Sequence, residues 1–390
     1  MNGAAGTTVI VGGEVLVDDR LVAADLVVAD GRIVALEHRS GRDRADGADG
    51  AAREVVDATG TIVAPGFVDL QINGGWGHDF TADPASIADV ARSLPGTGVT
   101  AFAPTIVSSS PSARAAALDA LRRFVPPADA AVPIGWHFEG PVISPHRPGA
   151  HDPSHIGVPD RAEWSAWTRD RGVAIVTLAP EVEGAHEMIP VLRDHGVVVS
   201  LGHTDCTADE LTDAVRAGAS MVTHLFNAMA PFGHRDPGPI GATLADDAVV
   251  AGLICDGIHV DAVAVRAAWR ALGASRVVLV SDAMAALGSV ETRFELGGVA
   301  VSVDGRGVRT ADGVLAGSNL ALDRAVRNLV AFTGCAAADA IRAASTTPAE
   351  IAGLHDRGRI TVGARADLVL LDPGLHVTRT IIGGATAWKS

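Results

Sequence analysis

Short apolar runs alternate with helix-like stretches through the middle of the chain. Runs of this length with polar ends are typical of buried strands. There are eight of them: Phe67–Ile72, Val99–Val107, Pro133–Phe138, Val173–Ala179, Val197–Leu201, Met221–Thr223, Val249–Cys255 and Arg276–Val280. Stretches with helical periodicity lie between most of them, including Pro84–Leu94, Ser112–Phe124, Ala185–Asp194 and Ala262–Leu272.

This alternation over roughly 220 residues predicts an α/β fold, a (β/α)₈ TIM barrel. An open doubly wound sheet is the alternative, but the Gly-x-Gly-x-x-Gly turn that would mark a nucleotide-binding sheet is missing from the sequence.

The two chain ends have a different pattern, with short strand-like runs separated by turns and no helical period before residue 65. The N-terminal runs are Thr8–Val11, Glu14–Val17, Leu26–Val28, Arg32–Leu36, Val55–Gly60 and Ile62–Ala64, with a charged exposed loop expected at 41–52. After Gly358 the runs return at Ile360–Val362, Ala366–Leu371, Val377–Thr380 and Ile381–Ile382. We therefore expect residues 1–65 and 358–390 to form one small discontinuous β-sandwich domain beside a barrel of residues 66–357.

The segment that joins the barrel to the C-terminal strands is turn-rich at first. It contains two hairpin-like runs, Arg293–Leu296 and Val299–Val303, and then two helical stretches, Leu320–Phe332 and Ala336–Ser345.

The stretch from Val197 to Met229 shows how the barrel would build a site. A buried strand ends at Gly202-His203, and a helix follows from Thr207, which precedes Glu210 as in a capping box. The next short strand ends at His224. Consecutive strands joined through a helix are parallel, so both histidines should lie at the same edge of the sheet.

Polar residues follow nearly all of the predicted strands. They are Gln71, Asn73, Thr105, Glu139, Glu181, His203, His224, Asp256, His259 and Asp282. Active sites of TIM barrels lie at the C-terminal ends of the strands, so this distribution predicts an active site. Taken singly, each acid is equally consistent with a helix cap, and each histidine with a hydrogen-bonded core residue.

Glu139, His203 and His224 form a plausible three-residue ligand set for one divalent metal ion, with room for water. Such an ion acidifies bound water, and Asp282 is then the candidate base that takes the water proton and delivers it to a leaving group. The alternative for Asp282 is a helix cap. Zinc is the first expectation for the metal, and iron, manganese and cobalt suit the same donors.

Two loops offer groups that could hold a substrate. His151, in Gly149-Ala150-His151, could donate a hydrogen bond to a carbonyl oxygen and polarise it. His234-Arg235 offers a basic pair for an anionic group, although a solvated loop is the simpler interpretation of Arg235.

Composition narrows the possible partners. A net charge of −15 argues against nucleic acid as a general partner, so an anionic substrate would need a local basic pocket. Three widely spaced cysteines form neither a metal motif nor a disulfide framework, which fits a reducing compartment. With neither a secretory signal nor a membrane span expected, the sequence predicts a soluble cytoplasmic protein.

Several motifs together resemble one known family. Pro65-Gly66-Phe67-Val68-Asp69 and Ala366-Asp367-Leu368-Val369 resemble the amidohydrolase superfamily. Six further motifs, in family order, resemble its N-acetylglucosamine-6-phosphate deacetylase family: HFEGP at 137–141, GHT at 202–204, THLFNAM at 223–229, CDGIH at 255–259, SDA at 281–283 and LAGS at 315–318.

The resemblance implies removal of acetate from a 6-phosphorylated acetamido sugar. It implies Glu139, His203 and His224 as metal ligands, Asp282 as the catalytic acid/base, and His151 at the acetyl carbonyl. It also implies a substrate pocket formed by Ala150, Asn227, Ala228, Arg235, Asp256, His259, Leu315, Ala316 and Gly317. The counterpart of Arg235 in that family reaches the neighbouring subunit's site, which implies a homodimer.

The first predicted strand departs from the wider superfamily. Many amidohydrolases carry His-x-His there, whereas this chain has Gln71 and Asn73, whose amides are poor zinc ligands. We therefore expect one essential metal, with Gln71 near a water molecule.

Three rival functions stay open from sequence. The first is the same chemistry on N-acetylgalactosamine 6-phosphate, which differs by the orientation of one hydroxyl group, or on a related acylamino sugar phosphate. A cyclic-amide hydrolase would normally need the missing histidine pair. A non-catalytic binding barrel would have little reason to keep all three ligand candidates and Asp282.

Overall fold

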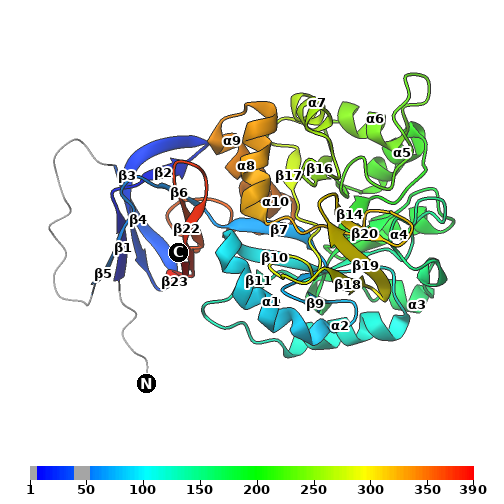
Figure 1. Ribbon diagram of the computed structural model, residues 1–390, viewed down its shortest axis with the longest axis horizontal. Helices are drawn as coiled ribbons and strands as arrows, with labels where there is room; N and C mark the ends of the chain where they lie inside the picture. Colours follow the sequence, from blue (N-terminus) through cyan, green and yellow to red (C-terminus); the bar gives the residue numbers. More distant parts are fainter. Residues whose placement is uncertain (1–6, 39–52) are drawn as a thin grey trace.

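The computed structural model describes residues 7–38 and 53–390, so the loop expected at 41–52 lies outside the described residues. Figure 1 shows a β-rich unit, built from the first six and the last three strands of the chain, on one side of a larger unit of strands and helices.

Nine strands from the two chain ends form one continuous sheet. In chain order they are β1 (Thr7–Val11), β2 (Glu14–Val17), β3 (Arg20–Ala29), β4 (Arg32–His38), β5 (Arg53–Asp57), β6 (Ile62–Pro65), β21 (Leu368–Leu371), β22 (Val377–Ile382) and β23 (Ala385–Lys389). Their order is β23-β22-β21-β6-β2-β3-β1-β5, with β4 on β3.

The antiparallel ladder between β6 and β21, with Val63 opposite Leu370, joins the two ends of the chain. Strands from both halves of the sheet contribute to one buried core, which includes Ile10, Leu26 and Leu368. The expected strand at Ile360–Val362 was wrong, because these residues lie in a loop before β21 and only Ile360 is buried in that core.

The barrel strands coincide with the eight apolar runs. They are β7 (Phe67–Ile72), β10 (Val99–Ile106), β12 (Trp136–Glu139), β13 (Val173–Leu178), β14 (Val198–Leu201), β15 (Met221–Val222), β16 (Val250–Leu253) and β17 (Val277–Leu279). All neighbouring pairs along this series are parallel.

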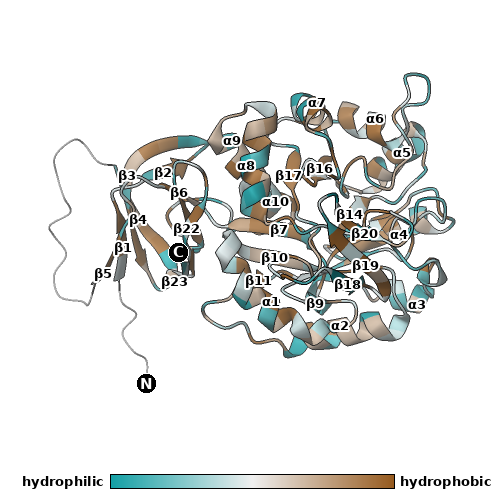
Figure 2. Cartoon of the chain, in the orientation of Figure 1, coloured by the Kyte–Doolittle hydropathy of each residue, from teal (hydrophilic) through white to brown (hydrophobic). Residues whose placement is uncertain are grey.

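The seam between first and last strand closes just beyond β17. The Asp282 amide donates to the Gln71 carbonyl at 2.8 Å, and the Asn73 amide donates to the Ala283 carbonyl at 2.7 Å. The expected (β/α)₈ barrel is therefore confirmed. Its strands are mostly hydrophobic, as the brown colour in Figure 2 shows, and they are buried along their length, as parallel strands covered on both faces must be.

Seven helices correspond to predicted stretches: α1 (Ile87–Ser93), α2 (Pro111–Arg123), α4 (Ala185–Asp194), α5 (Ala208–Ala217), α7 (Ala262–Leu272), α8 (Leu322–Thr333) and α9 (Ala337–Ala344). The capping box at α5 is confirmed, since Thr207 Oγ1 accepts the Glu210 amide at 3.2 Å and Glu210 Oε2 accepts the Thr207 amide at 2.7 Å. No helix in the described residues is long and apolar enough to cross a membrane.

Helix α6 (Gly238–Ala245) was not predicted, because Pro237-Gly238-Pro239 is typical of a turn in sequence. Proline is nevertheless tolerated in the first turn of a helix, where its missing amide hydrogen would have no helical partner. The short helices α3 (Arg161–Trp164) and α10 (Thr346–Ile351) were also missed.

A small antiparallel sheet follows the last barrel strand. It consists of β18 (Arg293–Leu296), β19 (Val299–Asp304) and β20 (Gly307–Thr310), of which the first two were expected. Its apolar side chains Leu296, Val301 and Val308 pack with Val107 and Met284 in a separate buried cluster. This contact brings the sheet to the side of the barrel where the strands end.

Candidate active site

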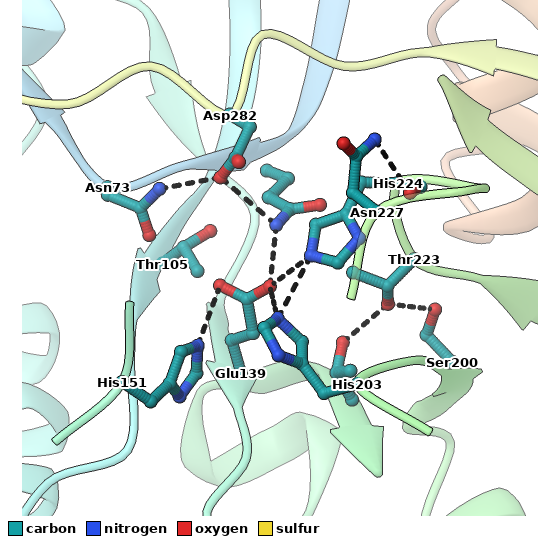
Figure 3. A network of polar contacts seen from close by, with 12 residues as sticks. Asn73, Thr105, Glu139, His151, Ser200, His203, Thr223, His224, Asn227 and Asp282 are labelled. Carbon is teal, nitrogen blue, oxygen red and sulfur yellow. Dashed lines mark hydrogen bonds and ion pairs between the residues drawn. The ribbon is translucent and has the colours of Figure 1, made fainter. Parts of the chain in front are cut away.

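Three side chains from the ends of strands β12, β14 and β15 converge in the barrel (Figure 3). Glu139 is the last residue of β12, and His203 and His224 each lie two residues beyond the end of β14 and β15. Both histidines have a positive φ, 49° for His203 and 29° for His224, which non-glycine residues rarely adopt. Backbone strain of this kind is concentrated at functional sites, where it aims a side chain that an extended strand would direct elsewhere.

The distances among these side chains fit one shared cation. Glu139 Oε1 lies 2.9 Å from His224 Nε2 and 3.2 Å from His203 Nε2, and the two Nε2 atoms are 3.1 Å apart. Two atoms bound to a tetrahedral zinc ion at about 2.05 Å are about 3.3 Å from each other. A buried carboxylate and two imidazoles therefore suit a single divalent metal at this point.

The hydrogen bond on the far side of the His203 ring fixes its tautomer. His203 Nδ1 lies 2.9 Å from the carbonyl oxygen of Arg147, which can only accept. The ring proton is therefore on Nδ1, and Nε2 directs a lone pair toward Glu139 and His224. A backbone partner of this kind orients a metal-binding imidazole in many proteins.

The His151 ring has the opposite arrangement. The Ser108 amide donates to His151 Nδ1 at 3.2 Å, and Ser108 Oγ lies 2.8 Å from the same atom. Because Nδ1 accepts, the neutral ring carries its proton on Nε2, which lies 3.8 Å from Glu139 Oε2. Burial lowers the pKa of His151 to about 4, so the ring is neutral near pH 7.

Proximity alone would admit His151 to the ligand set, since Glu139, His151 and His203 offer atoms within 4.8 Å of one another. The tautomers separate the two roles. His203 directs a lone pair into the site, as a ligand must, whereas His151 directs an N–H group, as a hydrogen-bond donor must.

Asp282 lies across the site from His151, on the turn after β17 with a φ of 47°. Its Oδ1 accepts from Asn73 Nδ2 at 2.7 Å and from Gln71 Nε2 at 3.1 Å. Burial, and next the negative charge of Glu139, raise the pKa of Asp282 to about 6. This carboxyl group can therefore both take up and release a proton near neutral pH.

Gln71 links the two carboxylates directly. Its Nε2 donates to Glu139 Oε1 at 2.9 Å as well as to Asp282. The amide hydrogens thus occupy the space between Glu139 and Asp282, where a second metal would need lone pairs. The structure agrees with one metal per site.

A cavity opens above these groups. It is lined by Asn73, Val107, Glu139, Gly149, Ala150, His151, His203, His224, Asn227, Ala228, His259, Asp282, Leu296, Val314, Leu315 and Gly317. Gly149 has a φ of 58°, and a Cβ there would lie 3.0 Å from the His203 ring, so this position requires glycine.

Most of the residues expected from sequence to hold substrate line this cavity, but three lie elsewhere. Ala316 is buried in the cluster under the small sheet, and Arg235 is exposed on the loop before α6. Asp256 is bonded to its own loop and is not among the lining residues.

Two residues that act on the site were not predicted from the sequence. Ser108 sets the His151 tautomer, and Arg147 sets that of His203 through its carbonyl oxygen. Ser108 closely follows strand β10, so the strand-end pattern could have indicated it. Arg147 acts through its backbone, and no side-chain pattern could have found it.

The fold and the site together define a parallel barrel with a buried histidine and carboxylate centre at the C-terminal ends of its strands, the architecture of a barrel hydrolase. The Amidohydrolase family model matches residues 62–387, and the chain belongs to this family.

Individual relatives agree with this assignment. The chain is 40% identical over 413 residues to N-acetylglucosamine-6-phosphate deacetylase from Homo sapiens, an alignment that covers 100% of this chain and 98% of that protein. It is 37% identical to N-acetylgalactosamine-6-phosphate deacetylase from Shewanella sp. (strain ANA-3), covering 85% of this chain and 84% of that protein.

One solved structure provides a comparison in three dimensions. A mutant of N-acetyl-D-glucosamine-6-phosphate deacetylase from Mycobacterium smegmatis, in complex with N-acetyl-D-glucosamine-6-phosphate, superposes with a TM-score of 0.88 at 32% identity. The superposition covers 99% of this chain and 100% of that chain.

Proposed function

We propose that the chain hydrolyses the acetamide bond of N-acetyl-D-glucosamine 6-phosphate, yielding D-glucosamine 6-phosphate and acetate. The observation that carries this proposal is the convergence of Glu139, His203 and His224 between a proton acceptor, Asp282, and an N–H donor, His151. The deacetylases to which the chain is similar supply the substrate class.

Glu139, His203 and His224 would hold one divalent ion, for which zinc is our first choice and iron, manganese and cobalt are alternatives. When bound, the ion supplies Lewis acidity that polarises the acetyl carbonyl and acidifies water. The buried Glu139 is suited to a cation: burial raises its pKa, but the neighbouring imidazoles of His151, His203 and His224 outweigh burial and hold that pKa well below its usual value.

The chain's own residues then move one proton and stabilise one charge. Asp282 removes a proton from the attacking water as the bond from water oxygen to acetyl carbon forms. The Nε2–H group of His151 donates to the carbonyl oxygen as negative charge develops there. Asp282 then delivers its proton to the sugar nitrogen as the carbon–nitrogen bond breaks, which regenerates the carboxylate.

The second candidate substrate is N-acetylgalactosamine 6-phosphate, which the similarity to the Shewanella protein favours. The two sugars differ only at one hydroxyl group, and both present the same acetamide to the groups described above. Acetate release should therefore be measured on both 6-phosphorylated epimers.

We further propose a homodimer in which Arg235 reaches the neighbouring site. The cavity-lining residues include neither lysine nor arginine, although the substrate carries a phosphate dianion. Arg235 is exposed and makes no hydrogen bond or ion pair with the residues that the structure describes, so its guanidinium group is available to a partner. A bidentate arginine is well suited to phosphate.

The proposal is tested by assaying acetate release after metal reconstitution of the purified protein. The enzyme should require a divalent metal and prefer a 6-phosphorylated acetamido sugar. A protein that binds one metal but releases no acetate from any of these sugars would instead support the non-catalytic barrel. Arg235→Ala should raise the apparent KM for the phosphorylated sugar far more than for the unphosphorylated one. Sedimentation analysis tests the dimer separately.

A further inference from the structure

The carboxylate of Asp256 is fully engaged within its own loop. Its Oδ1 accepts the backbone amides of Ile258 and His259, each at 2.8 Å. Its Oδ2 lies 2.7 Å from His259 Nδ1. Although burial alone would raise the pKa of Asp256, these bonds to His259 and to the amides lower it, so the group is an anion that only accepts hydrogen bonds.

The partner of Asp256, unlike Asp256 itself, lines the cavity. His259 is among the cavity-lining residues and its side chain is only 5% exposed. With Nδ1 donating to the carboxylate, the other ring nitrogen, Nε2, is the polar atom left for a substrate. The remaining lining histidines, His151, His203 and His224, contact Glu139.

The loop that carries this pair is also held from outside. Asn328 Nδ2, on α8, donates to the Cys255 carbonyl oxygen at 2.8 Å, next to Asp256. Phe332, on the same helix, packs within 3.2 Å of the Cβ position of Gly257. The loop therefore has anchors that do not depend on the Asp256 side chain.

We propose that Asp256 is a positioning residue that acts through His259: its carboxylate holds the Nδ1–H group of the ring and compensates the charge of the imidazolium form, whose Nε2–H group donates to the phosphate of the substrate. This inference rests on the proposed function for its ligand. A carboxylate behind the ring compensates the imidazolium charge, and a charge-assisted bond to phosphate is about twice as strong as a neutral one. The pair supplies a cationic group in a cavity whose lining residues include neither lysine nor arginine.

Asp256→Asn separates this role from that of a turn residue. An asparagine Oδ1 can still accept both backbone amides, so the turn is preserved. Its Nδ2 group, however, donates toward His259 Nδ1, which must then accept. The proton of the neutral ring moves to Nε2, and the compensating charge is lost.

Steady-state kinetics on the metal-loaded protein test the role in substrate binding. Asp256→Asn should raise the KM for the 6-phosphorylated sugar about 10-fold, with smaller changes in kcat and in the KM for the unphosphorylated sugar. Asp261→Asn is the matched control, since Asp261 caps α7 two residues after His259 and the change removes the same charge while keeping the cap to Val263. It should leave both KM values unchanged.

A double-mutant cycle with His259→Gln tests whether Asp256 acts through the histidine. In the His259→Gln background the Asp256 substitution should add less than about 2-fold to KM, because the imidazole ring through which Asp256 acts on the substrate has been removed. A full 10-fold effect in that background, or none in the wild type, would overturn the proposal.

Nitrogen-15 NMR of the histidine rings provides a readout that does not depend on turnover. The neutral His259 ring should be protonated at Nδ1 in the wild type and at Nε2 in Asp256→Asn, with the resonance identified by its loss in His259→Gln. The same tautomer in both proteins would refute the inference even if the enzyme is active. Absent deacetylase activity would refute the proposed function but leave this tautomer test valid.

Discussion

Replacing Asp282 by asparagine should remove proton transfer and leave the rest of the site in place. Asparagine Oδ1 can still accept from Asn73 and Gln71, as the carboxylate does at 2.7 Å and 3.1 Å. The substitution changes neither the volume of the side chain nor its buried hydrogen bonds. It removes the negative charge of the carboxylate and, with it, the ability to take up and release a proton.

The loss should be large because the cavity offers no second free carboxylate to replace this base. Glu139 and Asp282 are the only carboxylates among the cavity-lining residues, and Glu139 is bonded to His203 and His224. His151 carries its proton on Nε2, so its lone pair is on Nδ1, which faces Ser108, and a second proton would place a charge in a buried site. General acid–base catalysis contributes roughly 10²- to 10⁴-fold, and we expect the upper part of this range. A 10³- to 10⁴-fold loss corresponds to about 4 to 5.5 kcal/mol.

The assay is kcat for acetate release, with metal content and thermal unfolding measured on the same preparation. Metal content and Tm should match the wild type. Asp83→Asn is a suitable control, because this exposed aspartate caps a turn through Ala85 far from the site. A kcat within tenfold of the wild type, with metal retained, would refute the role given to Asp282.

Three further predictions concern the donor, one helix cap and the barrel interior. His151→Ala should lower kcat by roughly 10²- to 10³-fold while metal content is retained, the loss expected for one oxyanion donor; an equal loss of metal would instead make His151 a ligand. Thr207→Ala should lower the free energy of unfolding by about 1 kcal/mol in urea titrations and leave kcat unchanged, because it breaks only the capping box of α5. Burial lowers the pKa of His137 from 6.5 to about 4, so below pH 6.5 the unfolded chain gains a proton there that the native protein excludes. The wild type should therefore lose roughly 3 kcal/mol relative to His137→Gln as the pH falls from 7.5 to 4, and parallel stability profiles would contradict this.

The last prediction depends on a polar layer inside the barrel that no sequence pattern indicated. His137 Nε2 lies 2.7 Å from Thr177 Oγ1, which lies 2.6 Å from Thr223 Oγ1, and Ser200 Oγ follows at 2.6 Å. His137, Thr177 and Ser200 come from three different strands, and Thr223 directly follows a fourth, β15. In sequence each is a single polar residue in an apolar run, and only closure of the barrel brings them into one chain of hydrogen bonds.

The sequence alone determined the barrel and the positions of its candidate ligands. Apolar runs of strand length alternating with amphipathic stretches allow few folds, because parallel strands must be buried on both faces. The phase of each run then dictates which residue follows the strand end. This phase places Glu139, His203, His224 and Asp282 among the candidates, together with other strand-end acids such as Glu181 and Asp256.

Tertiary structure alone decided what each of these groups can do. The tautomers of His203 and His151 depend on the Arg147 carbonyl and the Ser108 amide, backbone groups of loops whose course the sequence does not specify. Likewise Asp256, a strand-end acid like the others, is bonded to His259 rather than directed into the cavity. Periodicity fixes the face and the end of a strand on which a residue lies, but a proton's position depends on contacts between segments distant in the chain.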